Sequence, residues 1–137
     1  MSKNFFDVKN VDFNIGGKTK VKNVSFSIEN KGDVVCLLGP SGIGKTTILR
    51  TIAGLEKIKK GSIELNGKIL SSENVNIDPE DRNISLAFQD NSLFPHYTVE
   101  KNILLGSERN TGKKDKSISL KEIVDLLDIF HILNKHP

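Results

Sequence analysis

The sequence predicts an α/β domain, with antiparallel strands first, then a strand–loop–helix unit and then further helices. Three observations support this order. Apolar residues alternate with polar ones near the N-terminus, a wholly apolar run at residues 34–38 leads into a glycine-rich loop, and helical spacing of apolar residues follows that loop and returns after residue 119. At 137 residues the chain is long enough for one domain with a core.

Two strands are expected in the N-terminal part of the chain. Residues 5–15 alternate loosely and end at a Gly-Gly pair that predicts a turn, and residues 21–28 repeat the alternation. The run at residues 34–38 is short, apolar and flanked by turn residues, which is typical of a strand buried on both faces. It contains Cys36, the only cysteine, which we interpret as a small buried thiol.

Local signals indicate the remaining elements. The expected elements are a helix over residues 46–55, a strand over 61–67 with a partner at 68–70, and a strand over 84–88. Two helices follow. Thr98 is the predicted N-cap of the first, and Ser119 caps the second, where Glu122 completes a capping box.

Composition and charge exclude several classes of protein. Hydrophobic residues make up 36% and charged residues 27% of the chain, as in soluble globular proteins. The net charge of +3 is spread along the chain, whereas a dedicated nucleic-acid-binding protein usually has a dense basic stripe. The N-terminus lacks the apolar segment of a secretory signal, and no stretch approaches the ~18 consecutive apolar residues of a membrane span. We expect a cytoplasmic protein that does not bind nucleic acid.

A phosphate-binding motif lies between the run at residues 34–38 and the helix predicted over 46–55. Residues 39–46 match G-x-x-x-x-G-K-[ST] throughout, in the strand-then-helix context that the pattern requires. Glycines let backbone N–H groups approach phosphate oxygens, and the helix start adds its free N–H groups. The Lys45 ammonium can reach the β- and γ-phosphates of ATP, and the Thr46 hydroxyl is the expected Mg²⁺ ligand. The predicted nucleotide-binding residues here are Gly39, Pro40, Ser41, Gly42, Ile43, Gly44, Lys45, Thr46 and Thr47.

From residue 5 onward the chain resembles the ATP-binding subunits of ABC transporters. The matching segments are Gly32-Asp33 before the phosphate loop, residues 46–55 after it, residues 82–89 (RNISLAFQ) and residues 93–99 (LFPHYTV). The resemblance implies a P-loop NTPase core of the ABC-type ATPase class with an N-terminal antiparallel β subdomain. It implies an incomplete domain, with the β subdomain and core over about residues 1–90 and the start of the helical subdomain over about 91–137.

The resemblance also gives roles to two further residues. Gln89 stands where the family keeps its Q-loop glutamine, which implies contact with Mg²⁺ and the attacking water and sensing of the γ-phosphate. Lys45 and Gln89 are therefore the implied catalytic residues in this chain. Phe13 is the best candidate for an aromatic ring that stacks on adenine, and a core position fits Phe13 equally well.

Other motifs of this family do not occur in the 137 residues: the Leu-Ser-Gly-Gly-Gln signature, an apolar strand ending in Asp-Glu, and a switch histidine after a strand. We therefore expect the chain to be the N-terminal portion of a longer subunit. Without the Asp-Glu pair it is expected to bind ATP and to hydrolyse it negligibly by itself, whereas the full-length protein is expected to couple ATP hydrolysis to transport.

The resemblance implies two kinds of partner. The segment from about Asn91 to Glu100 is expected to contact the membrane-spanning subunits through Leu93, Phe94 and Tyr97, although these residues also suit the domain's own core. A second ATP-binding subunit is the implied dimer partner. These partners imply a peripheral location on the inner face of the cell membrane. The segments around residues 79–96 are most similar to importers of ferric iron, polyamines, sulfate or molybdate, with ferric iron the first choice by a small margin.

Of three alternative functions, one remains open and two are disfavoured. A nucleotide-binding regulatory module without catalysis would also contain the phosphate loop, and the length of the natural gene product would separate it from an importer subunit. A soluble ABC-type ATPase acting on DNA or ribosomes is disfavoured because no coiled-coil insertion is present in the 137 residues. A GTPase is disfavoured because Asn134-Lys135 is followed by His-Pro and no Asp-x-x-Gly occurs.

Overall fold

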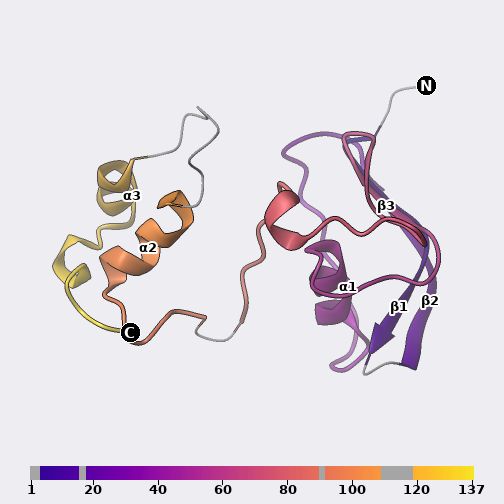
Figure 1. The fold of residues 1–137 in the computed structure, drawn as a ribbon, viewed down its shortest axis with the longest axis horizontal. Coiled ribbons are helices and arrows are strands. Elements are labelled where there is room, and N and C mark those ends of the chain that lie inside the picture. Colours follow the sequence, from indigo (N-terminus) through magenta and orange to yellow (C-terminus); the bar gives the residue numbers. More distant parts are fainter. Residues whose placement is uncertain (1–3, 16–17, 90–91, 109–118) are drawn as a thin grey trace. The chain divides into compact units, whose positions relative to one another are not determined.

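Four antiparallel strands form one sheet in the N-terminal part of the chain (Figure 1). The computed structural model describes residues 4–15, 18–89, 92–108 and 119–137, and it divides into two units, Met1–Ala87 and Phe88–Pro137. The strands are β1 (Phe6–Ile15), β2 (Lys18–Ile28), β3 (Ser62–Leu65) and β4 (Lys68–Ser71). Their order in the sheet is β2-β1-β3-β4, so β1 lies between β2 and β3 and pairs with both. The strands expected over residues 5–15, 21–28, 61–67 and 68–70 are confirmed, and the predicted Gly-Gly turn lies outside the described residues.

Irregularities in strand β1 explain why its apolar alternation is loose in the sequence. The register with β2 shifts between Val8 and Val11, where Asn10 has a positive φ of 51°. The Asn10 N–H donates to Ser25 Oγ at 2.9 Å, so the irregular residue has a hydrogen-bond partner. One extra residue in a strand returns the following side chains to the same face. Val8 and Val11 are therefore both buried although three positions separate them.

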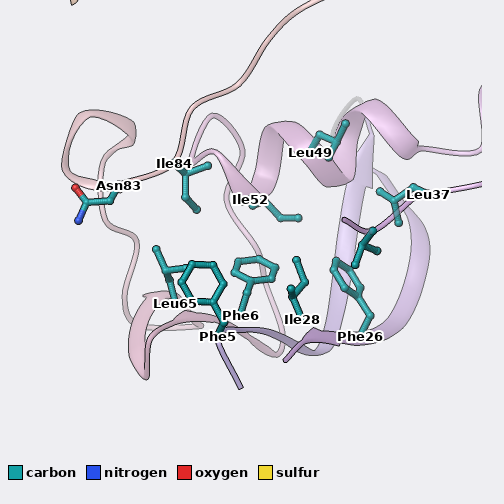
Figure 2. A pocket seen from close by; sticks show the side chains of 11 residues that line it. Phe5, Phe6, Phe26, Ile28, Leu37, Leu49, Ile52, Leu65, Asn83 and Ile84 are labelled. Atoms are coloured by element: carbon teal, nitrogen blue, oxygen red, sulfur yellow. The ribbon is translucent and has the colours of Figure 1, made fainter. Parts of the chain in front are cut away.

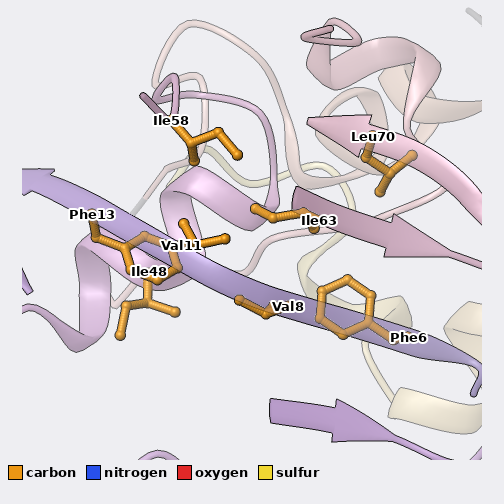
Figure 3. Close-up of a cluster of buried hydrophobic side chains, with 8 residues drawn as sticks. All are labelled: Phe6, Val8, Val11, Phe13, Ile48, Ile58, Ile63 and Leu70. Carbon is orange, nitrogen blue, oxygen red and sulfur yellow. The ribbon is translucent and has the colours of Figure 1, made fainter. Parts of the chain in front are cut away.

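The core of the first unit lies between the sheet and helix α1 (Lys45–Ile52) (Figure 3). Strand β1 contributes half of it, and β3, β4, α1 and the loop after α1 complete it. The buried core residues are Phe6, Val8, Val11, Phe13, Ile48, Ile58, Ile63 and Leu70. Because Ile48 is held in this cluster, the start of α1 is fixed relative to the sheet.

Two apolar runs differ from their predicted structure. Residues 34–38 and 84–88 form no strand, since neither run belongs to a ladder among the described residues. The side chains of Val34 and Leu38 are 89% and 92% exposed, and Cys36 is exposed as well. The predictions of two-sided burial and of a buried thiol are therefore wrong for this structure. An apolar pattern favours burial, but a strand also requires a neighbouring segment to accept and donate its backbone hydrogen bonds.

The second unit contains helix α2 (Val99–Glu108) and helix α3 (Leu120–Leu127), with a short 3-10 turn at Phe130–Ile132. Both predicted caps are confirmed. Thr98 Oγ1 accepts from the Lys101 N–H at 3.3 Å, and the capping box of Ser119 and Glu122 is formed in both directions. The first N–H groups of α2 lack partners within the helix, and the C-terminal segment supplies two carbonyls for them. The Val99 and Glu100 N–H groups donate to Lys135 O and Leu133 O at 2.9 and 3.0 Å.

In the part of the chain that the structure describes, no helix has the length and apolar character needed to cross a bilayer.

Candidate functional site

The glycine-rich loop leads directly into helix α1 and positions its backbone for an anion. Gly42 and Gly44 have φ values of 78° and 112°, and residues with a Cβ rarely adopt this backbone conformation. Gly44 is the N-cap of α1, and its carbonyl accepts the first helical hydrogen bond, from the Ile48 N–H at 3.0 Å. The N–H groups of the first helical turn lack partners within the helix, so they are available to a ligand.

The charges around α1 also favour an anion at its N-terminus. The first turn of α1 contains no acidic residue, while Arg50 lies in the last turn. The positive end of the helix dipole is therefore not neutralised by a local carboxylate. Residues 39–43 and Thr46 are exposed, so phosphate oxygens can approach the loop from solvent.

The Lys45 side chain folds back over the loop. Its ammonium donates to the carbonyls of Gly39 and Pro40 at 2.7 and 2.8 Å. An ammonium has three N–H donors, so these two bonds leave capacity for a phosphate oxygen. The two carbonyls hold the positive charge at the mouth of the loop, where the β- and γ-phosphates of a nucleotide are expected.

The structure brings the predicted residues from Gly39 to Thr47 together as one continuous loop and helix start. Thr47 is partly buried, and its carbonyl accepts from Thr51 Oγ1 at 2.7 Å, within α1. Gln89 is exposed and belongs to the second unit, whereas the loop belongs to the first. Its predicted role stays a prediction.

Phe13 requires a correction. Its side chain is 0% exposed and packs in the core cluster with Ile48. A ring that stacks on adenine needs one face open to the ligand. The structure therefore gives Phe13 the core position and not the adenine contact. The irregularity at Asn10 is the physical reason, because it returns both Val11 and Phe13 to the same face as Val8.

Comparison with known proteins decides the family. A family model described as ABC transporter matches residues 21–137. The chain belongs to the ABC transporter family. It is 38% identical over 136 residues to an sn-glycerol-3-phosphate import ATP-binding protein of Rhizobium johnstonii, covering 98% of this chain and 36% of that protein. It is 36% identical over 131 residues to an Fe(3+) ions import ATP-binding protein of Fusobacterium nucleatum, covering 95% of this chain and 34% of that protein. The chain thus spans about a third of the length of these curated relatives.

Solved structures confirm the fold. A nucleotide-free ATP-binding cassette from an ABC transporter matches with a TM-score of 0.74 at 24% identity, covering 98% of this chain and 58% of that chain. A putative ABC transporter ATP-binding protein from Pyrococcus furiosus matches with a TM-score of 0.71 at 25% identity, covering 96% of this chain and 60% of that chain. The resemblance to ABC-type ATPases, with an incomplete P-loop NTPase domain, is therefore confirmed.

An apolar pocket in the first unit of this ABC-family chain is separate from the phosphate loop (Figure 2). It is a cavity of about 290 Å³ between the sheet and α1. Its lining residues are Phe5, Phe6, Phe26, Ile28, Val35, Leu37, Leu49, Ile52, Leu65, Asn83 and Ile84. Since Asn83 is the one polar side chain in that lining, the pocket has little to orient a charged ligand, and we do not assign the nucleotide to it.

Asn102 organises the segment that is expected to contact a membrane subunit. Its Oδ1 accepts from the Phe94 N–H at 2.8 Å, and its Nδ2 donates to the carbonyls of Phe94, Tyr97 and Thr98 at 3.1, 3.2 and 3.0 Å. Lys101 Nζ lies 4.3 Å from the centre of the Tyr97 ring. Leu93 and Phe94 are 51% and 52% exposed, so they do not close the core of the second unit. Of the predicted segment, residue 91 lies outside the described residues.

Sequence reasoning assigned no role to Asn102 or to Arg82, although Arg82 opens the segment on which the resemblance rests. No signal in the sequence indicated its burial, because its neighbours Asp81 and Asn83 are polar. The structure buries it, with 1% of its surface exposed.

Proposed function

We propose that the chain is the ATP-binding part of an ABC importer subunit, with residues 39–47 binding the phosphates of ATP. The observation that carries the proposal is the loop itself. Its glycines adopt positive φ values, and the first turn of α1 contains no carboxylate. Lys45 Nζ lies 2.7 and 2.8 Å from the carbonyl oxygens of Gly39 and Pro40. Backbone N–H groups, a helix dipole and a cation thus converge on one exposed position.

The residues present also fit Mg²⁺ that arrives with the nucleotide. No group of three His, Cys, Asp or Glu side chains in the described ranges can hold a metal ion. Mg²⁺ typically keeps several waters and takes phosphate oxygens together with a few protein ligands. Thr46, in the first turn of α1 and exposed, would supply its hydroxyl, and Gln89 is the second proposed ligand. The bound ion would neutralise charge between the β- and γ-phosphates.

The activity and partners of the longer protein are part of the same proposal. The relatives are named as import ATP-binding proteins for sn-glycerol-3-phosphate and for Fe(3+) ions, which supports a role in solute import. We propose that ATP hydrolysis by the longer protein drives that import, with Gln89 orienting water, and that the 137-residue chain hydrolyses ATP negligibly. The segment of Leu93, Phe94 and Tyr97, in which Leu93 and Phe94 are exposed, would bind a membrane-spanning subunit on the cytoplasmic face. A second ATP-binding subunit would complete the dimer.

Replacement of Lys45 tests the proposed function. In Lys45→Ala the phosphates lose a charge-assisted hydrogen bond, and the Kd for Mg²⁺–ATP should rise roughly tenfold or more. The measurement is calorimetric titration of the chain with Mg²⁺–ATP, together with an unfolding curve that checks that the variant is folded. Lys59→Ala removes an equal charge from an exposed turn after α1 and should leave the Kd within about twofold. Equal affinities for native chain and Lys45→Ala would contradict the proposal.

A further inference from the structure

Arg82 is a buried cation that connects helix α1 to strand β4 and to the loop after β4, all within the first unit. The residue is 1% exposed, and its three side-chain nitrogens donate to six acceptors. The acceptors are Thr51 O at 3.1 Å, Ile52 O at 2.9 Å, Leu70 O at 3.3 Å, Ser71 Oγ at 2.7 Å, Asn76 Oδ1 at 3.1 Å and Ile77 O at 2.7 Å. None of these acceptors is a carboxylate, so neutral oxygens on three segments hold the guanidinium.

The bonds from Arg82 to α1 are made at the C-terminal end of the helix. The carbonyls of Thr51 and Ile52 belong to its last turn, where the helix dipole is negative and the final carbonyls lack N–H partners within the helix. Thr51 O also accepts from the Gly54 N–H at 3.0 Å, whereas Arg82 is the donor described for Ile52 O. A Cβ at Gly54 would lie 2.6 Å from Arg82 Nε, so the turn after α1 closes tightly around the guanidinium.

Ile48 holds α1 near the middle of the helix. It is buried in the core cluster between the sheet and α1 (Figure 3). With a rise of about 1.5 Å per residue, Ile48 lies about 4.5 Å along the axis from Lys45 and about 6 Å from Ile52. Ile52 also packs against the cluster, but apolar contacts are non-directional, whereas hydrogen bonds to carbonyls prescribe a direction. The Arg82 bonds therefore fix the orientation of the C-terminal end.

The orientation of one end of α1 determines the position of the other. A tilt about Ile48 that moves the C-terminal end by about 1 Å moves the N-terminal end by about 0.8 Å in the opposite direction, given these axial distances. A binding site must be held within about 0.5 Å of its productive geometry. The N-terminal end carries Lys45, and Thr51 Oγ1 donates to Thr47 O at 2.7 Å, so the last turn is also bonded directly to a proposed phosphate-binding residue.

We propose that Arg82 is a positioning residue for the phosphate loop: by fixing the C-terminal end of α1 to β4 and the loop after it, Arg82 sets the geometry in which the N-terminal end meets phosphate. The inference rests on the proposed function, in which residues 39–47 bind the phosphates. A guanidinium suits the task because its planar fork of five donors holds acceptors on several segments at once, which an ammonium cannot. Burial lowers the pKa of the Arg82 guanidinium, and the Asp78 carboxylate partly opposes this effect; the side chain stays protonated.

The test compares the phosphate affinity of folded Arg82→Lys with that of the native chain. Calorimetric titration gives the Kd values for Mg²⁺–ATP and for Mg²⁺–tripolyphosphate, at a temperature at which circular dichroism shows both proteins fully folded. Tripolyphosphate has three linked phosphates without base or sugar, so it reports on the loop alone. Lysine keeps the charge but loses the planar fork. We expect both Kd values to rise by about fivefold, the lower end of typical coupling between sites.

Two control variants separate positioning from a general loss of stability. Gly61→Ala alters the contact between β3 and β1, away from α1, and should keep both Kd values within about twofold when it is folded. Arg50→Lys changes the other arginine at the end of α1, whose side chain is 40% exposed, and should also stay within about twofold. A merely structural Arg82 would resemble Gly61→Ala, with lower stability and native affinity in the folded state.

The outcomes distinguish the inference from the proposed function. If the native chain binds neither ligand, or Lys45→Ala binds both as tightly as the native chain, the proposed function fails and the inference fails with it. If Lys45→Ala weakens binding but folded Arg82→Lys keeps both native Kd values, loses affinity for ATP alone, or loses no more than Gly61→Ala, only the inference is overturned.

Should Arg82→Lys not fold, NMR spectra of the native chain replace it. The ¹⁵N-detected Nε–H signal of Arg82 should shift as Mg²⁺–tripolyphosphate fills the loop, because the bound anion and Arg82 hold opposite ends of α1. The Nε–H signal of Arg50 is the control and should stay in place. An Arg82 signal that is unchanged at saturation, or that shifts no more than the Arg50 signal, overturns the inference.

Discussion

Arg82→Leu should unfold the first unit under conditions in which the native chain is stable. Leucine fills part of the space, but six oxygens lose their Arg82 donor. The carbonyls of Thr51 and Leu70 keep the N–H groups of Gly54 and Ile77, whereas the carbonyls of Ile52 and Ile77 lose the donor described for them. A buried polar group left without a partner costs about 1–3 kcal/mol, and relaxation of the loop offsets part of the sum. We expect a loss of about 4 kcal/mol in the free energy of unfolding, against a total of roughly 5–15 kcal/mol for an ordinary domain.

Urea denaturation followed by circular dichroism measures this loss. Arg50→Leu is the matched control, because Arg50 also lies near the end of α1 but its side chain is 40% exposed and pairs with Glu56 at 3.4 Å. An exposed ion pair contributes about 0–1 kcal/mol, so the control should be close to the native chain. Equal losses in the two arginine variants would mean that the buried hydrogen bonds of Arg82 do not hold the first unit together.

Gly61→Ala should have the second large effect on stability. Gly61 precedes β3 with a φ of 88°, and its backbone lies against β1. A Cβ there would collide with the carbonyl oxygen of Lys9 and would lie 2.6 Å from the carbonyl oxygen of Asn10. The left-handed conformation costs about 1–2 kcal/mol for a residue with a Cβ, and the backbone shift needed to relieve the collision costs about 1–3 kcal/mol more. We expect a total loss of about 3 kcal/mol.

Gly32→Ala separates the two contributions. Gly32 has a φ of 100°, but a Cβ there would meet nothing within 4 Å. It should therefore lose only the conformational part, about 1–2 kcal/mol. The same denaturation experiment serves both variants. If Gly61→Ala were no less stable than Gly32→Ala, the close approach of β3 to β1 would not be a constraint on the fold.

Features that depend on neighbouring residues in the sequence could be predicted. The capping box of Ser119 and Glu122 and the N-cap at Thr98 each involve residues three positions apart, so the pattern contains the whole interaction. The phosphate loop was predictable for the same reason. Its proposed function depends on backbone conformation and on Lys45, and all of these lie within residues 39–46.

Features that depend on distant segments could not be predicted. The irregularity at Asn10 needs Ser25 as a partner on β2, and it decides that Phe13 faces the core. Arg82 finds its acceptors between 5 and 31 positions away, so its sequence neighbours did not indicate burial. The apolar pattern of residues 34–38 predicts a buried strand, but it does not indicate which segment would pair with that strand. Among the described residues, no segment pairs with it.

The central claim is that the loop at residues 39–47 binds the phosphates of ATP. Two-dimensional ¹H–¹⁵N NMR spectra of the 137-residue chain, recorded during titration with Mg²⁺–ATP, test it most directly because each backbone amide reports its own surroundings. The account predicts that the largest shifts belong to the amides of Gly42, Gly44, Lys45 and Thr46, which lie in the loop and at the start of α1. Largest shifts around the apolar pocket instead, or no shifts at all at saturating nucleotide, would contradict it.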